Sequence, residues 1–309
     1  MDLQFINPVS RTFHPRDGQG AMVCDASLPF FQEHLMPRVA GWSPVTTRRP
    51  SSPEGTAARF ELAGSLKTGM TEASDVTALP GGRFLVVGDK KDSAVVVGAD
   101  GKTTALQLPG LKNGKSELEG VAYDPVRQNL FVSREESREV LRYEWNGDPK
   151  TEPKLEKTFS YDLQGATNKG IEGMAFLSGD VSPTGTPQLL LAKEGDPQEL
   201  SLVGETGKGK PLPIKLEKEV LAVCRDFSAT AIDPRTGHLF ISSDESAAVA
   251  QVKLLRDGDK VVGKLVQSFP LRDAKGKALE RVEGLSFNEK GDLFVLTEND
   301  GKLHQLSRK

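Results

Sequence analysis

Acidic residues recur along this chain at two kinds of position, and they are the side chains whose types and spacing could do chemistry. The first kind opens a short apolar run and is followed by glycine, as in Glu119-Gly120, Glu172-Gly173 and Glu283-Gly284. The second kind closes the next apolar run, as at Asp244 and Glu298. Carboxylates gathered in one place favour hard cations, and Ca²⁺ takes about six to eight oxygen ligands in flexible geometry.

These acids belong to an internal repeat that occurs five times. In each copy an acid or serine precedes a short apolar strand, a turn rich in Pro, Gly and Asp follows, and a second apolar strand ends in an acid. The copies recur about every fifty residues, close to the ~40–50-residue period of propeller blades. They span residues 71–89, 118–136, 171–195, 226–245 and 282–299.

Two further strands fit between copies of the repeat. Asn146-Gly147 and Asp257-Gly258 each stand between alternating apolar runs, and such dipeptides are strong signals of a β-hairpin. Four antiparallel strands make one propeller blade. The last repeat lacks a fourth strand, which Arg59–Leu66 can supply by pairing with Lys302–Leu306. We therefore predict an all-β propeller of about five four-stranded blades, closed by this N-terminal strand, with six blades as the alternative.

The predicted blades bring the acids together at one mouth of the central channel. The first strand of a blade lies innermost, and its start shares a face with the end of the antiparallel second strand. Carboxylates crowded there would raise one another's pKa values unless a cation offset their charge. Zinc is not favoured, because it prefers His and Cys ligands. One ring would hold Asp75, Glu119, Glu172, Asp226 or Ser228, and Glu283, and a second ring Asp89, Glu135, Glu194, Asp244 and Glu298.

Basic residues beside several acids offer an alternative without a metal, namely a network of salt bridges across the mouth. If the protein is a hydrolase, three of these bases could instead hold an anionic substrate. Those three are Arg134, Lys193 and Arg225, and the pair Lys90-Lys91 follows Asp89 in the same way.

Residues 1–57 do not join the repeat, and residues 58–309 form the predicted propeller domain. The first segment ends in Arg48-Arg49-Pro50-Ser51-Ser52-Pro53, which is typical of a linker. Its earlier part carries apolar residues such as Phe30, Phe31 and Trp42. We expect either a strap that packs on the propeller or an arm that docks a protein partner. A sixth blade would have to come from this segment.

Composition narrows the remaining function classes. The net charge of −3 does not favour nucleic acid as a partner, and no apolar run is long enough to span a membrane. The N-terminus shows no signal peptide, so a cytoplasmic location is expected unless a signal has been removed.

Cys24 and Cys224 are expected to be two reduced thiols. The four histidines form no metal-ligand or catalytic motif.

Residues near the C-terminus resemble a known family, the SdiA-regulated (YjiK-like) domain. The segments that carry the resemblance are Asp226-Phe227-Ser228-Ala229, Ser243-Asp244-Glu245-Ser246, Val282-Glu283-Gly284-Leu285 and Thr297-Glu298-Asn299. It is strongest over Lys218–Leu306 and extends toward Arg59. The family is similar in architecture to esterase-like phytases and to lactonases of the gluconolactonase type. The resemblance implies a calcium-binding propeller, with Glu119, Glu172, Asp226, Asp244, Glu283 and Glu298 as ligands; Asp75 is added from its place in the ring.

Two functions remain open on these observations. The first is a binding or structural interaction module that Ca²⁺ binds or stabilises. The second is a metal-dependent hydrolase of phosphate esters or lactones that uses the carboxylates of the channel mouth on a small anionic substrate. Propellers host both classes, so the fold does not decide between them. An open cavity at the mouth would favour the hydrolase, and a mouth plugged by salt bridges would favour the module.

Overall fold

The computed structural model describes residues 59–90, 93–111, 116–135, 137–163, 170–193, 195, 197–207 and 209–309. The chain divides into two units, Met1–Pro50 and Ser51–Lys309, and the fold described below belongs to the second. The predicted arm or strap of residues 1–57 lies outside the described residues, and so does Glu194.

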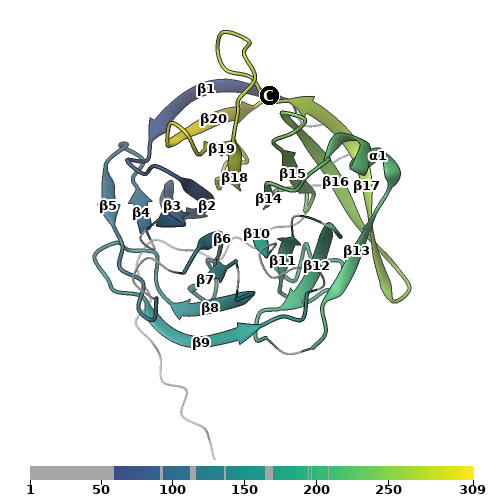
Figure 1. Ribbon diagram of the computed structural model, residues 1–309, viewed down its shortest axis with the longest axis horizontal. Coiled ribbons are helices and arrows are strands. Elements are labelled where there is room, and N and C mark those ends of the chain that lie inside the picture. Colours follow the sequence, from purple (N-terminus) through teal and green to yellow (C-terminus); the bar gives the residue numbers. More distant parts are fainter. Residues whose placement is uncertain are drawn as a thin grey trace, which may run out of the picture. The chain divides into compact units, whose positions relative to one another are not determined.

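The described residues form five blades around a common centre, which confirms the predicted propeller (Figure 1). The first blade contains β2 (Ala73–Leu79), β3 (Arg83–Gly88), β4 (Ser93–Val97) and β5 (Thr103–Ala105). The second contains β6 (Leu118–Asp124), β7 (Asn129–Arg134), β8 (Glu139–Glu144) and β9 (Lys154–Ser160). The third contains β10 (Ile171–Leu177), β11 (Gln188–Lys193), β12 (Glu199–Gly204) and β13 (Leu212–Leu216). The fourth contains β14 (Ala229–Ile232), β15 (Leu239–Ser243), β16 (Ala248–Asp257) and β17 (Lys260–Pro270).

The fifth blade joins the two ends of the propeller. Its first three strands are β18 (Val282–Phe287), β19 (Leu293–Thr297) and β20 (Lys302–Arg308), and its outer strand is β1 (Phe60–Lys67). β1 pairs antiparallel with β20 from Phe60 opposite Arg308 to Lys67 opposite Lys302, as the sequence predicted. Beyond the ladder, the hydroxyl of Thr68 donates a 2.8 Å hydrogen bond to the carbonyl of Gly301. The ring is therefore closed by backbone hydrogen bonds.

The third and fourth blades form one continuous eight-stranded sheet, a feature that the sequence did not reveal. Their outer strands β13 and β17 pair in parallel, with Ile214 opposite Val261. Between β13 and β14 the chain forms α1 (Lys218–Val223), whose Val220 is fully buried between these two blades. In the described part of the chain, no helix has the length and apolar character that crossing a membrane requires.

Buried apolar side chains form five clusters, one between each pair of neighbouring blades. The alternation of side chains along a strand explains this arrangement, because successive residues point to opposite faces of the sheet. In β3, Leu85 and Val87 pack toward the second blade, while Phe84 and Val86 pack toward the fifth. Each blade is thus apolar on both faces, and only its ends and outer edge remain for polar chemistry.

Candidate functional site

A β-bulge at the start of the inner strand aims one side chain of a blade at the channel mouth. In the third blade Ile171 pairs with Lys193 and Gly173 pairs with Ala192, so Glu172 is the extra residue. Similar register shifts mark the inner strands of the first, second and fifth blades. An extra residue breaks the alternation of the strand and redirects its side chain. The equivalent residues of these four blades are Ser74, Glu119, Glu172 and Glu283; in the fourth blade, where no bulge occurs, Ser228 stands directly before the inner strand.

The glycine after the bulged glutamate is required by the next blade. A Cβ added to Gly120 would lie 2.7 Å from the hydroxyl oxygen of Ser133 and 3.3 Å from the backbone nitrogen of Met174. At Gly284 it would lie 3.0 Å from Val76 of the first blade. The inner strands approach so closely that only glycine fits after the glutamate. The Glu-Gly pair therefore places a carboxylate at the mouth without a clash between blades.

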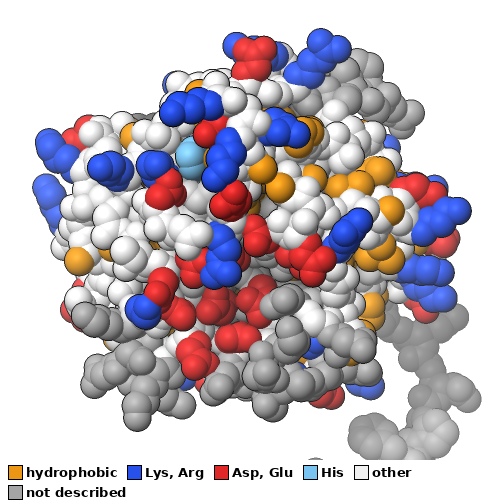
Figure 2. All heavy atoms as spheres, turned by 45° about the horizontal axis from the view of Figure 1, so that its top comes forward, with side chains coloured by type: hydrophobic (Ala, Val, Ile, Leu, Met, Phe, Trp, Pro, Cys, Tyr) orange, Lys and Arg blue, Asp and Glu red, His pale blue; other side chains and the backbone are white. Residues whose placement is uncertain are grey.

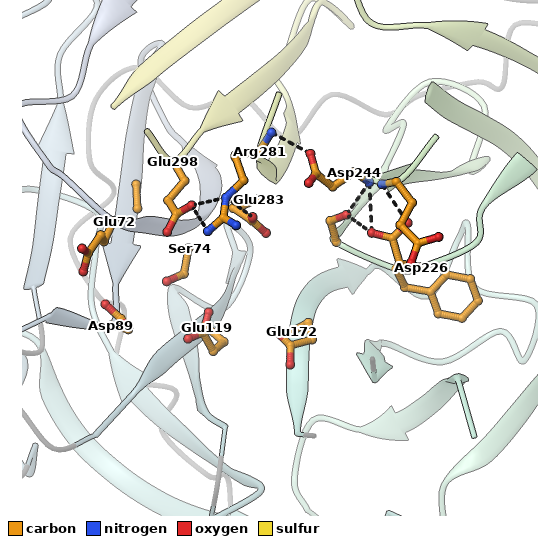
Figure 3. Close-up of a pocket in the computed structure, with 14 residues that line it drawn as sticks. Glu72, Ser74, Asp89, Glu119, Glu172, Asp226, Asp244, Arg281, Glu283 and Glu298 are labelled. Carbon is orange, nitrogen blue, oxygen red and sulfur yellow. Dashed lines mark hydrogen bonds and ion pairs between the residues drawn. The ribbon is translucent and has the colours of Figure 1, made fainter. Parts of the chain in front are cut away.

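Together these residues line a cavity of about 390 Å³ at the mouth of the channel (Figure 3). Its described lining contains nine acidic side chains and one basic side chain, Arg281. In Figure 2 acidic side chains gather around a hollow in the face that is shown. The acids of the lining are Glu72, Asp89, Glu119, Glu172, Asp226, Asp244, Glu245, Glu283 and Glu298.

Burial and the crowding of carboxylates raise the pKa values of two glutamates in the cavity. Burial raises the pKa of Glu119 to about 9, and the charge of Glu172 adds to this effect, while a hydrogen bond with Ser74 opposes it. Burial also raises the pKa of Glu283 to about 7, reinforced by Glu298 and Asp244 and opposed by Arg281. At neutral pH, Glu119 therefore holds a proton and Glu283 is divided between its two forms.

Asp89 carries an oxygen with no partner in this cluster. Its Oδ1 atom is buried and has no hydrogen-bond partner among the described residues. Burial raises the pKa of Asp89, the backbone N–H of Lys90 opposes the shift, and the charge of Glu298 adds to it. Burying a polar atom without a partner is costly, so this oxygen is available to a ligand that carries positive charge.

Two acids of the lining are held by the loops of the fourth and fifth blades. The carboxylate of Asp226 accepts hydrogen bonds from the hydroxyl of Ser243, from the hydroxyl of Ser228 at 3.1 Å and from the backbone N–H of Asp244 at 3.1 Å. Oδ1 of Asp244 in turn accepts hydrogen bonds from the backbone N–H of Arg281 at 2.6 Å and that of Val282 at 3.3 Å. Asp244 thus connects the fourth blade to the fifth, Asp226 organises the loops of the fourth blade, and both line the cavity.

Arg281 was not identified from the sequence, although it stands two residues before Glu283. Its Nε atom donates a 2.6 Å hydrogen bond to Glu298, and its Nη2 atom lies 2.5 Å from the same carboxylate oxygen. Nε also lies 3.9 Å from Glu283. Figure 3 shows the guanidinium between these two carboxylates. Glu72 was missed too; it lies just before the first bulge and pairs with Lys90.

Asp75 does not line the cavity, because the bulge of the first blade shifts the pattern by one residue. Ser74 takes the place at the mouth, and Asp75 takes the place that glycine has in the second, third and fifth blades. Its fully buried carboxylate accepts hydrogen bonds from the backbone N–H groups of Val76 at 2.8 Å and Val121 at 2.9 Å, and from that of Met174. It therefore joins the inner strands of three blades.

The three bases proposed for an anionic substrate also lie away from the described cavity lining. Arg134 pairs with Glu139 at 3.0 Å and donates to the carbonyl of Gly110. Lys193 is buried, and its ammonium donates to the carbonyl of Pro197 at 2.8 Å. Both side chains are therefore engaged by residues that do not line the cavity. Arg225 is exposed and its carbonyl accepts a hydrogen bond from Gln198.

The remaining ring residues that the structure describes fall at or near the mouth. Glu119, Glu172, Asp226, Asp244, Glu283 and Glu298 all line the cavity. Glu135 stands beside it, since its charge contributes to the raised pKa of Glu119. Within the described residues, no three His, Cys, Asp or Glu side chains stand in an arrangement that could hold a metal ion. Apart from Asp75, the predicted calcium ligands therefore share a cavity without forming a ligand set.

Comparison with a solved structure shows the same fold. The PQQ-bound aldose sugar dehydrogenase of Streptomyces coelicolor is 13% identical, with a TM-score of 0.55, over 84% of this chain and 100% of that one. A structure titled a putative gluconolactonase is also 13% identical, with a TM-score of 0.48, over 80% of this chain and 81% of that one.

The model of the SdiA-regulated family matches residues 131–300, which is more than half of the chain. This range contains all four segments that carried the resemblance in the sequence, and it runs from the second blade to the fifth. The chain belongs to the SdiA-regulated family.

Proposed function

We propose that this protein is a cation-dependent hydrolase that binds a small substrate at the mouth of the propeller channel. The observation that carries the proposal is the cavity of about 390 Å³ with nine acidic side chains and one basic side chain in its described lining. Its volume is within the range of small-molecule sites, about 300–1,000 Å³. The substrate classes that we propose are lactones and phosphate esters, since both can be hydrolysed with a metal ion as Lewis acid.

Ca²⁺ is the cation that best fits the donor atoms. The acids of the mouth offer oxygen ligands alone, and the unpartnered Oδ1 of Asp89 is one of them. Glu172 and Asp89 would hold the cation, because Asp226 and Asp244 already organise the loops. The side chains are not arranged as a ligand set, so binding requires the ligand side chains to rotate.

Two glutamates of the cavity have pKa values suited to proton transfer near neutral pH. Glu283, with a pKa of about 7, can accept a proton from an attacking water, and Glu119, with a pKa of about 9, can donate one to a leaving group. When bound, the cation would polarise the scissile group. The bulges fix where both carboxyl groups enter the cavity.

The test is turnover of a panel of lactones and phosphate monoesters with Ca²⁺ or with EDTA. We expect activity with Ca²⁺ on at least one substrate class, and a loss of about a hundredfold or more in Glu172→Gln, which keeps the shape of the side chain and removes a charge. Glu289→Gln is the control, because it makes the same change at an exposed glutamate in the turn between β18 and β19, at the end of a blade opposite the mouth. Equal activity in both variants would refute the role of the mouth.

A binding or structural module is the second candidate, and the ion pairs of Arg281 with Glu298 and Glu283 favour it. These contacts already offset part of the charge without a metal. In this case Ca²⁺ would stabilise the fold by mass action, about 2.7 kcal/mol at a hundredfold excess over the dissociation constant, without turnover. A rise in melting temperature with Ca²⁺ and no hydrolysis on the panel would support the module over the hydrolase.

A further inference from the structure

The inner strand of each blade is hydrogen-bonded to another strand on one side only, because it lies at the end of its sheet. Backbone N–H groups on its free edge face the channel and need partners from elsewhere. In the first blade, the N–H of Ala78 donates a 2.9 Å hydrogen bond to the hydroxyl of Ser286 on β18. In the second and third blades, the N–H groups of Val121 and Met174 donate to the carboxylate of Asp75.

The two amides that Asp75 holds in neighbouring blades stand directly beside the bulges of the mouth. Val121 lies two residues after Glu119, and Met174 lies two residues after Glu172, where register shifts interrupt the pairing of β6 and β10. A bulge bends its strand and redirects a side chain, so the direction of a bulged glutamate depends on how the backbone beside it is held. Asp75 therefore fixes the backbone at the base of both glutamates.

Asp75 is itself held firmly enough to act as such a support. Its side chain is fully buried, and its two oxygens accept hydrogen bonds from the N–H of Val76 at 2.8 Å and that of Val121 at 2.9 Å. The donors that the described residues offer to it come from β2, β6 and β10. Glu283, on β18, takes no part in this arrangement.

The two glutamates that Asp75 supports are close enough to influence each other. Both line the cavity, and the charge of Glu172 contributes to the raised pKa of Glu119. Glu119 is also the proton donor of the proposed hydrolysis, and proton transfer requires hydrogen-bond distance to the group that receives the proton. A displacement of about 1 Å can cost about a hundredfold in rate, so the support at the base of Glu119 matters for turnover.

We propose that Asp75 is a positioning residue of the mouth, which binds the amides beside two bulges and thereby holds the carboxyl groups of Glu119 and Glu172 at fixed places in the cavity. Its effect on catalysis rests on the proposed function, because Glu119 is the proton donor of that reaction. Asp75 acts through these glutamates and not on the substrate, since it is fully buried and does not line the cavity.

The first test is backbone amide hydrogen exchange measured by NMR, which needs no substrate. Asp75→Ala removes the acceptor, so the amides of Val121 and Met174 should exchange about tenfold or more faster than in wild type, relative to the other protected amides of β6 and β10. Asp75→Asn keeps the shape and one acceptor oxygen, so its effect should lie between wild type and Asp75→Ala. If Asp75→Ala does not fold, Asp75→Asn alone should show faster exchange at one or more of Val76, Val121 and Met174.

Backbone chemical shifts in the same spectra report on the bulges. The amide signals of Glu119 and Glu172 should move in the Asp75 variants, and that of Glu283 should move less. Ser286→Ala is the matched control, because it removes another buried side-chain acceptor of an inner-strand amide, that of Ala78, away from the mouth. It should leave the signals of all three glutamates in place.

The second test is turnover of δ-valerolactone and of phenyl phosphate under the conditions in which the wild-type protein is active. Asp75→Asn should lower kcat about tenfold or more and leave KM within about twofold, because Glu119 is displaced while the other acids of the lining remain. Ser286→Ala should keep the kcat of wild type. Melting temperatures above the assay temperature check that each variant is folded.

The outcomes separate this role of Asp75 from the proposed function. Unchanged amide exchange in both Asp75 variants, or unmoved signals at Glu119 and Glu172, overturns the inference. A kcat equal to wild type in Asp75→Asn, or one that Ser286→Ala lowers as much, does so too. If the wild-type protein hydrolyses no lactone and no phosphate ester, the proposed function fails, and the exchange and shift data decide by themselves whether Asp75 holds the glutamates.

Discussion

The two ends of the inner strands carry acidic residues in very different states. At the far face, where a turn joins the first two strands of a blade, Asp124, Asp233 and Asp292 each have several hydrogen-bond donors. Asp233 accepts from the backbone N–H of Arg235, the hydroxyl of Thr236 and the guanidinium of Arg308. At the mouth, nine acids share one arginine in the described lining.

This difference separates acids that hold the fold from acids that are available to a ligand. On the far face, turn N–H groups and arginines satisfy the carboxylates, and Arg308 also lies over the rings of Phe60 and Phe287. Such charge-assisted hydrogen bonds stabilise the folded state. At the mouth, burial and mutual repulsion raise the pKa values of Glu119 and Glu283, which disfavours the ionised form. The same residue types therefore stabilise one face and strain the other.

The largest effect should come from breaking the buried pair of the far face. Asp233→Asn removes the charge that faces Arg308, whose side chain is only 15% exposed, and breaking a buried ion pair costs about 3–5 kcal/mol. We expect the free energy of unfolding in urea to fall by about 3 kcal/mol. The exposed Asp100→Asn is the control, with little change. If the two variants are equally stable, the far face does not hold the fold as described.

At the mouth, by contrast, removing an acidic charge should stabilise the folded protein. The pKa of Glu119 rises from 4.5 to about 9 on folding, so its ionisation in the folded state opposes folding. Stability is therefore lost as the pH rises from about 4.5 through about 9. In EDTA, Glu119→Gln should raise the melting temperature at pH 8.5 by at least about 2 °C, the shift that ~1 kcal/mol gives in a domain of this size, and by less at pH 5. A lower melting temperature of the variant at pH 8.5 would contradict the idea that ionised Glu119 destabilises the fold.

The smallest effect should come from a far-face arginine at the surface. Arg127 pairs with Asp124 at 3.3 Å and with Glu205 at 3.0 Å, but its side chain is 48% exposed. Asp124 also keeps the backbone N–H groups of Val126 and Arg127 as donors. Arg127→Gln should lower the free energy of unfolding by no more than about 1 kcal/mol. A loss as large as that of Asp233→Asn would show that ion pairs, and not turn N–H groups, satisfy the far face.

The fold could be predicted from the repeat because the features that define a blade are encoded locally in the sequence. Each turn, each apolar strand and each Glu-Gly pair is encoded within about twenty residues, and the closing pair of strands followed from counting strands in the last blade. The parallel pairing of β13 with β17 was not predictable in this way, because it depends on how two outer strands meet in space. The segment between β13 and β14 shows only a short helix, with no pattern that identifies such a contact.

The site was predicted less well, and the β-bulge explains much of the error. A bulge shifts the alternation by one residue, so spacing alone could not show that Ser74 and not Asp75 faces the cavity. Arg134 and Lys193 end second strands next to ring acids, and alternation turns them away from the mouth to Glu139 and Pro197. Arg281 precedes its strand in a left-handed conformation that no residue type in the sequence announces.

The closing strand has a consequence for how the protein is made. β1 leaves the ribosome before any other described strand, yet its partner β20 follows the remaining four blades; Thr68 and Gly301 are 233 positions apart. During synthesis β1 is thus an unpaired strand, which is a template for aggregation. Its sequence limits that danger, because FELAGSLK alternates only weakly and is interrupted by Gly64. Because so distant a contact forms slowly, completion of the ring should be the late step of folding, and a chaperone that shields β1 would act before it.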